Sequence, residues 1–405
     1  MEYIVSELFY GLMRLLAHPL PYILLVAMML LAYKRVKRER QQFHVRVQPE
    51  FLDVFPPLFA GLCLGAFLSI LTFVAGLSTT MAFIWLLTFV TVVLLLAGPR
   101  FLSPAVVLGA TVLLALYLPL LEGATGYEAV DHWLAGIGEA PLLPIVSLLA
   151  LFVFLEGLLA MRQGKTAAPV QKRSSRGKWV GGFEVKRLWP LPVVLFLPGG
   201  MLEPIGWWPL LPVGEEGLAV FIVPFAIGMQ SLVFRELPTI VLKQAGLRVI
   251  ALSFLLIGFA ITAWFEPLFI VVTAVVAIVA RIGLLWFEYV KEAKAAPYFS
   301  PQTGGLMVLA VLPNSPAEKM GLQSGEVIVK VNGVTVYGAA SYYQGIQENS
   351  AYCKIEAVNL NGEVRRLEGS VHASAHHELG VLFVKEKETN TPATQETAAE
   401  TGHTS

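Results

Sequence analysis

Hydrophobic and polar positions divide the chain into two unequal parts. Through the first 290 residues, apolar side chains form long runs, most of them near the ~20 residues that a membrane-spanning helix needs. The runs cover residues 9–33, 55–76, 79–97, 103–121, 141–161, 188–202, 217–234, 248–265 and 268–287. From residue 297 onward, short alternating stretches are separated by turn residues. The pattern predicts a polytopic α-helical membrane domain of about nine spans, followed by a small β-rich domain with two short helices.

The sixth run, residues 188–202, is the weakest of the predicted spans. It is short and contains Pro190, Pro192 and Pro198. Proline lacks a backbone donor and breaks a helix interior. The segment could therefore cross the membrane, re-enter it or lie at its interface.

Lysine and arginine are distributed unevenly between the predicted loops. Alternate loops hold Lys34, Arg35, Lys37, Arg38, Arg40, Arg46, Arg100, Arg162, Lys165, Lys172, Arg173, Arg176, Lys178, Lys186, Arg187, Arg235, Lys243 and Arg248. The intervening loops contain no Lys or Arg, and their charged side chains are Asp and Glu. Arg14, within the first run, is the single Lys or Arg on that side. Because basic loops stay in the cytoplasm, this distribution predicts an external N-terminus and a cytoplasmic C-terminal domain, provided that residues 188–202 cross.

Composition supports the membrane assignment. The chain is 56% hydrophobic and 14% charged, so its polar side chains are too few to cover a soluble globule of this size. Its net charge of +0 is a cancellation of local biases and says little about partners. The only cysteines, Cys63 and Cys353, cannot build a disulfide framework or a zinc site.

Sequence signatures of enzymes are missing. The string His376-His377-Glu378 lacks a second histidine at the spacing of a zinc protease, and there is no Gly-x-Ser-x-Gly. No phosphate-binding glycine motif occurs either. We therefore expect neither an enzyme nor a cofactor.

Two features of the membrane domain could carry function. Small residues recur at Gly61, Gly65 and Ser69, which lets another helix approach closely. Packing within the chain is the favoured interpretation, and a homo-oligomer through this face is the alternative. Glu156 and Arg281 are ionisable residues inside apolar runs, which raises the alternative of a transporter. Both lie near the cytoplasmic end of their spans, where a long side chain can reach water, so a structural role is favoured.

Turn and cap signals organise the C-terminal part. Ser315-Pro316-Ala317-Glu318 fits a helix start, and Gly321 suits the left-handed residue that ends a short helix. Asn332-Gly333 and Asn361-Gly362 are typical of tight hairpin turns.

In this order, these strings resemble the PDZ family over residues 297–388. The resemblance implies a carboxylate-binding loop at Gly304-Gly305-Leu306, an edge strand from Met307 to Val311, and a groove helix over residues 339–349. The peptide-binding residues would be Gly304, Gly305, Leu306, Met307, Val308, Leu309, Ala310, Tyr342 and Ile346. An extended peptide would add to the edge strand, and core packing is the alternative role for Leu306, Val308 and Ile346.

Three further features run through the chain: the polytopic body, the basic string Tyr33-Lys34-Arg35-Val36-Lys37-Arg38-Glu39-Arg40 followed by Phe43-His44-Val45-Arg46-Val47, and the PDZ-like domain that ends in His376-His377-Glu378-Leu379-Gly380. Together they resemble the MinJ family of division-site topology factors from Gram-positive rods. We therefore expect a membrane domain at residues 1–290, a connector at 291–296, the PDZ domain at 297–388 and a disordered tail at 389–405. The resemblance implies a non-enzymatic bridge at poles and septum between the curvature-sensing protein DivIVA and the membrane ATPase MinD. An accessory factor for regulated proteolysis or secretion is the main alternative.

Overall fold

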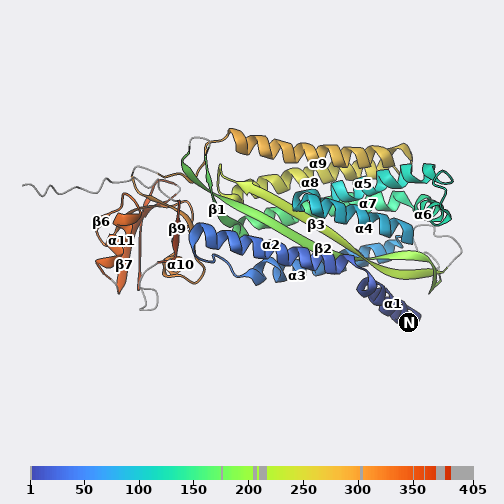
Figure 1. Cartoon of the computed structure of the whole chain (residues 1–405), viewed down its shortest axis with the longest axis horizontal. Coiled ribbons are helices and arrows are strands. Elements are labelled where there is room, and N and C mark those ends of the chain that lie inside the picture. The colour runs from blue at the N-terminus through green and yellow to red at the C-terminus, as the bar shows by residue number, and fades with distance from the viewer. Residues whose placement is uncertain are drawn as a thin grey trace, which may run out of the picture.

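The structure of the chain, a computed structural model, describes residues 2–174, 177–203, 208, 217–301, 304–349, 351–359, 361–370 and 379–384. A long helical domain with a β-hairpin through it is joined at one end to a small β-rich domain (Figure 1). Residues 389–405, the predicted disordered tail, and His376-His377-Glu378 lie outside the described residues.

Nine α-helices form most of the long domain. They are α1 (Glu2–Ala17), α2 (Leu20–Phe43), α3 (Phe55–Ala75), α4 (Met81–Ala97), α5 (Pro104–Tyr117), α6 (Glu128–Gly138), α7 (Leu142–Arg162), α8 (Pro238–Thr262) and α9 (Leu268–Lys294) among the described residues. Short 3-10 turns lie at η1 (Glu50–Asp53), η2 (Pro99–Phe101), η3 (Leu118–Leu121) and η4 (Gln163–Thr166). Helix α9 continues to Lys294, into the predicted connector.

Five of the helical segments are long and apolar enough to cross a membrane: Glu50–Ala75, Pro104–Leu121, Leu142–Thr166, Pro238–Thr262 and Leu268–Lys294. Helices α1 and α2 form a sixth span if they are counted together, although the chain bends by 52° between them. Helix α4 is apolar but shorter. The chain therefore contains a helical membrane domain, as its sequence predicts.

The sixth and seventh predicted spans are not helices. Residues 188–202 lie in strand β2 (Trp179–Leu202), and residues 217–234 lie largely in β3 (Leu218–Val233). The two strands form an antiparallel hairpin, and β1 (Ala168–Arg173) pairs with the first part of β2. The prediction of about nine helical spans is wrong here. Both strands nevertheless run along the length of the helices, from the PDZ end to the opposite end (Figure 1).

Strand backbone at membrane depth must have its polar groups covered, because lipid offers no hydrogen bonds. The open edge of β2 meets this requirement partly through Pro190 and Pro192, which have no N–H to satisfy. Their carbonyl oxygens lie against Gly61 and Gly65 of α3, where any Cβ would collide with them. The small-residue face therefore packs within the chain, and the predicted alternative of a homo-oligomer through Gly61 and Gly65 is wrong, since β2 occupies that face.

Further along the same edge, side chains of α3 replace strand partners. The N–H of Val194 donates to Ser69 Oγ at 3.0 Å, and Thr72 Oγ1 donates to the Val194 carbonyl at 2.6 Å. The N–H of Phe196 donates to the Leu77 carbonyl at 2.9 Å. The edge is thus satisfied by α3 and the loop that follows it.

The outer edge of β3 is covered by groups from two other segments. Near the end of the domain remote from the PDZ domain, the N–H of Val220 donates to Glu7 Oε2 at 3.1 Å, and Arg14 Nη1 donates to the Val220 carbonyl at 2.6 Å. Toward the other end, the N–H of Gly228 donates to the Leu102 carbonyl at 2.9 Å. A hairpin can therefore lie inside the bundle without an exposed edge at these positions.

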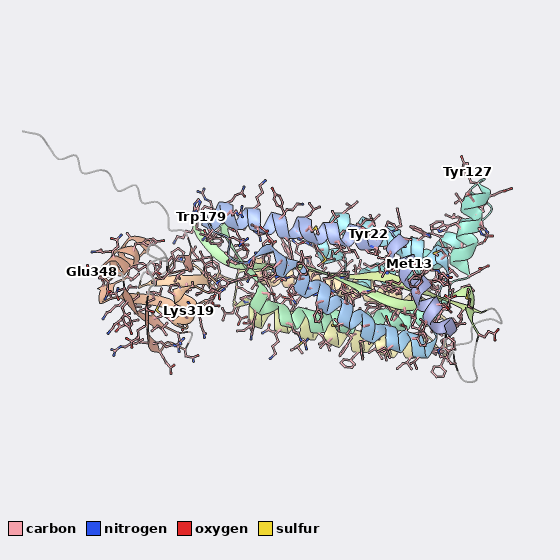
Figure 2. The ribbon with its side chains drawn as sticks, turned by 90° about the horizontal axis from the view of Figure 1, so that it is seen from below. Met13, Tyr22, Tyr127, Trp179, Lys319 and Glu348 are labelled. Atoms are coloured by element: carbon pink, nitrogen blue, oxygen red, sulfur yellow. The ribbon has the colours of Figure 1, made fainter. Side chains whose placement is uncertain are left out.

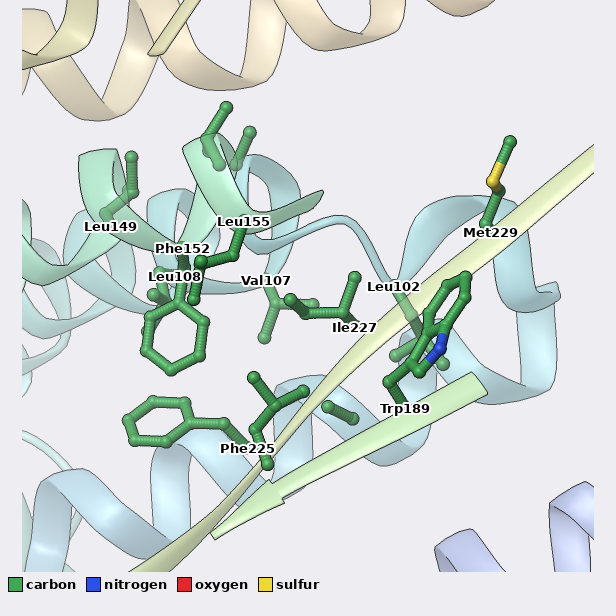
Figure 3. Close-up of a cluster of buried hydrophobic side chains, with 14 of the residues drawn as sticks. Leu102, Val107, Leu108, Leu149, Phe152, Leu155, Trp189, Phe225, Ile227 and Met229 are labelled. Carbon is green, nitrogen blue, oxygen red and sulfur yellow. The ribbon is translucent and has the colours of Figure 1, made fainter. Parts of the chain in front are cut away.

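One face of the hairpin forms the centre of the membrane domain. Odd-numbered residues of both strands point into the main core, since side chains alternate along a strand. Phe225 of β3 meets Phe152 of α7 at 4.7 Å between ring centroids, and Trp189 of β2 is buried in the same core, beside Leu102 (Figure 3). This packing, rather than helix formation, explains the apolar character of the two runs.

Glu156 of α7 and Arg281 of α9 are paired rather than separate. Arg281 Nη2 lies 2.6 Å from Glu156 Oε1, and Ser103 Oγ donates to Glu156 Oε2 at 2.6 Å. All three side chains are buried. The expectation that each ionisable side chain reaches water on its own is therefore wrong, because the two neutralise each other inside the bundle.

The C-terminal domain contains a six-stranded sheet and two short helices. Its elements are β4 (Leu306–Val311), α10 (Pro316–Lys319), β5 (Val327–Val331), β6 (Val334–Thr335), α11 (Ala339–Gln347), β7 (Tyr352–Val358), β8 (Val364–Ser370) and β9 (Val381–Phe383). The strand order is β8-β7-β5-β4-β9, with β6 paired to β5.

The local signals at Ser315, Gly321 and Asn332-Gly333 are confirmed, whereas in the Asn361-Gly362 turn only Gly362 has a positive φ, of 82°. Ser315 caps α10 by accepting the N–H of Glu318 at 3.2 Å, and Gly321 has a φ of 83° after it. Asn332 and Gly333 both have positive φ, 49° and 86°, in the turn between β5 and β6. These turns fix the register of the strands.

The two domains are in direct contact. The N–H of Gly181 in β2 donates to the Phe299 carbonyl at 2.8 Å, and Val47, after α2, packs against Ala310 and Leu382. Trp179 marks this junction in Figure 2, opposite the end that carries Tyr127. The membrane domain therefore holds the C-terminal domain close to one end of its helices.

Candidate peptide-binding groove

Strand β9 is the last strand of the sheet and lies next to β4. Strand β4 is paired on both sides, with β5 through Leu306 and Met307 and with β9 through Val308, Ala310 and Val311. The prediction that Met307–Val311 forms the edge strand is therefore wrong. Among the described residues, β9 has β4 as its only strand partner.

Hydrogen bonding shows which way the backbone of β9 points. The N–H of Val308 donates to the Glu326 carbonyl, and its carbonyl accepts from Gly325, both on the β5 side. Val308 and Phe383 therefore face each other as a non-hydrogen-bonded pair. The N–H and C=O of Phe383 point away from β4, toward the side where another strand could add.

Side chains of β9 alternate between two surroundings. Val381 and Phe383 pack against the core of the C-terminal domain, whereas Leu382 faces Val47 of the membrane domain. The Phe383 ring meets Tyr342 of α11 at 4.8 Å, edge to face. Helix α11 and strand β9 therefore stand next to each other, with their aromatic side chains in contact.

The nine predicted peptide-contact residues lie in different surroundings in the structure. Leu306 and Val308 share the core of the C-terminal domain with Tyr342 and Ile346, as the alternation predicts. Met307 and Leu309 belong instead to the core that joins the membrane domain, and Ala310 packs on Val47. Gly304 is exposed, and Gly305 lies against Ile328 of β5. Contact of any of these residues with a peptide stays a prediction.

Helix α11 spans Ala339–Gln347, two residues shorter than its predicted range. Gly345 lies over Val331 of β5, where a Cβ would be 2.8 Å from the carbonyl oxygen. The glycine therefore allows the helix to lie close to the sheet. It also has a low helix propensity.

The membrane domain reaches the open side of β9. Gln171 of β1 donates from Nε2 to the Phe383 carbonyl at 2.7 Å. Gln42 of α2 holds the Gln171 backbone with two hydrogen bonds, of 3.0 and 3.1 Å. One of the outward-facing carbonyls of β9 is thus already bonded to a side chain from the other domain.

Strand β9, at the edge of the sheet next to α11, is not predicted from the sequence. Its signal is modest: Gly380, with a φ of 80°, precedes the short apolar run Val381–Val384, the last of the described residues. The Gly380 carbonyl accepts from Leu312, which ties this turn to the segment after β4. Attention to the last apolar run before the polar tail could have identified a strand here.

The C-terminal domain contains little reactive chemistry. The Cys353 thiol on β7 is buried, and burial raises its pKa to about 11, so it is a poor nucleophile. In the described part of the chain, no three His, Cys, Asp or Glu side chains gather as a metal site. Backbone groups and apolar side chains are what the groove presents, which suits binding of an extended peptide.

The fold and the groove together define a class: a membrane protein with a helical domain that carries a PDZ domain. The PDZ domain family matches residues 307–352. The cell division topological determinant MinJ of Bacillus subtilis is 31% identical over 374 residues, covering 91% of this chain and 93% of that protein. The chain therefore belongs to the MinJ family of cell division topological determinants.

Other relatives support the same division of the chain. A probable cell division topological determinant MinJ of Lacticaseibacillus paracasei is 26% identical over 361 residues, covering 88% of this chain. The serine protease HTRA3 of Mus musculus is 38% identical over only 72 residues, or 18% of this chain. Similarity to proteases is thus confined to a short region.

Proposed function

We propose that this chain is a non-enzymatic membrane scaffold in division-site selection. It would hold a cytoplasmic PDZ domain at the membrane and bridge a DivIVA-like protein to a MinD-like ATPase. The similarity to MinJ of Bacillus subtilis over 91% of the chain is the observation that carries this proposal. Residence in a multi-pass form, with enrichment at septum and poles, is part of it.

The basic residues support the proposed orientation. Arg38 pairs with Glu184, Arg187 pairs with Asp53, and Arg235 Nε lies 2.7 Å from Glu292 Oε1. These pairs join segments that are far apart in the sequence, and the last parts of α2 and α9 and the first part of β2, which carry most of them, lie next to the PDZ domain (Figure 1). Because basic loops stay inside, the PDZ domain and this end would face the cytoplasm.

The groove between β9 and α11 is the proposed contact for one partner. A peptide segment would add to β9 through the backbone groups of Phe383 and Val381, with Tyr342 and Ile346 as the helix wall. Strand addition provides backbone hydrogen bonds without sequence preference, and the side-chain pockets provide specificity. The other partner would contact the helical domain or its loops.

Val381→Asp tests the groove. The substitution places a charge at the half-buried start of β9 and should reduce recruitment of the groove partner by about tenfold or more. Val364→Asp is the matched control, because Val364 is 61% exposed on β8, at the opposite end of the same sheet. Equal recruitment by both variants, with both folded, would remove the groove from the mechanism. Charges at Leu306 or Val308 are less informative, since both are buried in the core.

Co-purification separates the division role from the alternative of a proteolysis or secretion factor. We expect DivIVA-like and MinD-like proteins to be retained with the full chain from membranes of dividing cells. A protease or translocase in their place would favour the alternative. The serine protease similarity covers 18% of this chain and gives that alternative no catalytic residues.

A further inference from the structure

A small cavity lies in the membrane domain where α2, η1, η4 and the first parts of β1 and β2 meet. Its volume is about 60 Å³, which leaves room for a group as large as about four or five waters. Five cationic side chains line it: Lys34, Arg35, Arg38, Lys186 and Arg187. It is therefore a strongly basic site at the end of the helices next to the PDZ domain.

Two carboxylates neutralise part of this charge from one side. Asp53 is shared by Arg35 and Arg187. Glu39, which is fully buried, accepts from Arg35 Nη1 at 2.6 Å. Arg35 also donates from Nη2 to the carbonyl of Pro49 at 3.2 Å. These contacts fix the two guanidinium groups in place.

Besides Asp53, the carboxylate that lines the cavity is Glu184. It pairs with Arg38 and lies 3.0 Å from Lys186 Nζ. Lys34 is exposed at the cavity. Asp53 and Glu184 line the cavity, and Glu39 pairs with Arg35 from behind it, so three carboxylates stand against five cations and leave a formal excess of two positive charges around the cavity. This excess of positive charge, on side chains that line one cavity, attracts an anion to it.

Arg38 supplies a second observation that points to a ligand. Its Nε is buried and has no hydrogen-bond partner among the described residues, although its Nη1 is paired with Glu184. A buried donor without an acceptor is uncommon and costs free energy. An anion with several acceptor oxygens in the cavity would satisfy it.

The surroundings indicate where that anion comes from. Leu31 of α2 lines the cavity, and its neighbours Leu30 and Tyr33 are 52% and 64% exposed on the outside of the helix. An apolar helix surface that leads into a basic cavity at the end of the spans matches a lipid, with chains on the helix and a head group in the cavity.

We infer that this cavity binds the phosphate group of an anionic phospholipid. Arg38 Nε and Lys34 would donate to the phosphate oxygens, and Arg35 and Arg187, held by Asp53, would supply the surrounding positive potential. This inference goes beyond the proposed function and is independent of the peptide groove. It makes the membrane domain sensitive to the lipid around it.

Native mass spectrometry of the full chain, with phosphatidylglycerol or phosphatidylcholine added to the detergent, tests the inference. The unmodified chain should retain phosphatidylglycerol in preference to phosphatidylcholine. Lys34→Gln with Arg38→Gln should lower that preference by about tenfold, since each basic contact contributes separately. Lys37→Gln with Arg40→Gln is the matched control, because it removes two exposed charges of the same helix that do not line the cavity.

Three outcomes would overturn the inference. One is no preference between the two lipids in the unmodified chain. Another is an equal loss in the lining and control variants, which would indicate general electrostatic attraction. The third is full displacement of the lipid by inorganic phosphate at the same concentration, which would assign the site to a soluble anion. Lys34→Gln alone changes an exposed side chain and keeps the test valid if the double variant fails to fold.

Discussion

Arg281 and Glu156 form an ion pair inside the helical bundle, with Arg281 Nη2 2.6 Å from Glu156 Oε1. Ser103, at the start of α5, completes the contact by donating to the same carboxylate. Three helices, α5, α7 and α9, are therefore tied together by one buried polar cluster. The three side chains bond to one another, so no ion or proton pathway is needed to explain why they are buried.

Arg281→Leu should destabilise the bundle strongly, by about 3 kcal/mol or more, because it leaves the Glu156 carboxylate buried without its cation. Arg281→Leu together with Glu156→Leu should recover most of that loss, since both charges are then removed. Thermal unfolding of the purified chain in detergent measures the difference. Equal destabilisation by the single and double variants would contradict the pairing as the cause.

Gly61→Ala should destabilise the contact between α3 and β2 by about 1–3 kcal/mol, because the new methyl group meets the Pro190 carbonyl and the two segments must separate. Gly258→Ala is the control: it lies in α8 with open space around its Cβ position, and alanine improves helix propensity there. Denaturation in detergent should show a loss for the first variant and none for the second.

The sequence predicts the helices and the domain order well, because long apolar runs have few alternatives in a membrane. It fails for β2 and β3 because apolar runs of helix length look alike whether lipid or protein surrounds them. The periodic clue is Pro190, Pro192 and Pro198, which fall on one edge of a strand and remove donors where β2 has no strand partner.

The groove could be predicted only in part. Its helix follows from a local pattern, and Tyr342 and Ile346 lie on its buried face as expected. The groove strand depends on sheet order, which joins β9 to β4 across about 70 intervening residues. Likewise, Glu156 and Arg281 lie on separate helices, and nothing local in the sequence pairs them.

Cys353 should resist alkylation in the folded chain. Burial raises the pKa of its thiol to about 11, so about a hundredfold fewer molecules carry the reactive thiolate at pH 8 than for an ordinary thiol. Because the folded pKa is raised, its stabilising contribution is present below pH 9 and is lost between pH 9 and about pH 11. Labelling of a Cys63→Ser variant with iodoacetamide, folded and in denaturant, measures the protection. Equal rates in both states would contradict it.

The hydrogen bond from Gln171 to the Phe383 carbonyl predicts that the membrane domain competes with ligands of the groove. An extended peptide that pairs with β9 along its length needs that carbonyl as an acceptor, so it must displace the Gln171 amide. Gln171→Ala should therefore raise peptide affinity, by about fivefold for one hydrogen bond of ordinary strength.

Overlapping peptides of DivIVA-like and MinD-like proteins, titrated onto the full chain in detergent, provide the measurement. Gln163→Ala is the control, because Gln163 lies in η4 and the hydrogen bond of its side chain is to Thr166, not to β9. Peptides that extend past Phe383 should gain affinity in Gln171→Ala, whereas peptides too short to reach it should not. A gain in affinity for the short peptides alone would show that Gln171 does not act by competing for the Phe383 carbonyl. Unchanged affinity for all peptides would show that β9 is not the strand to which ligands add.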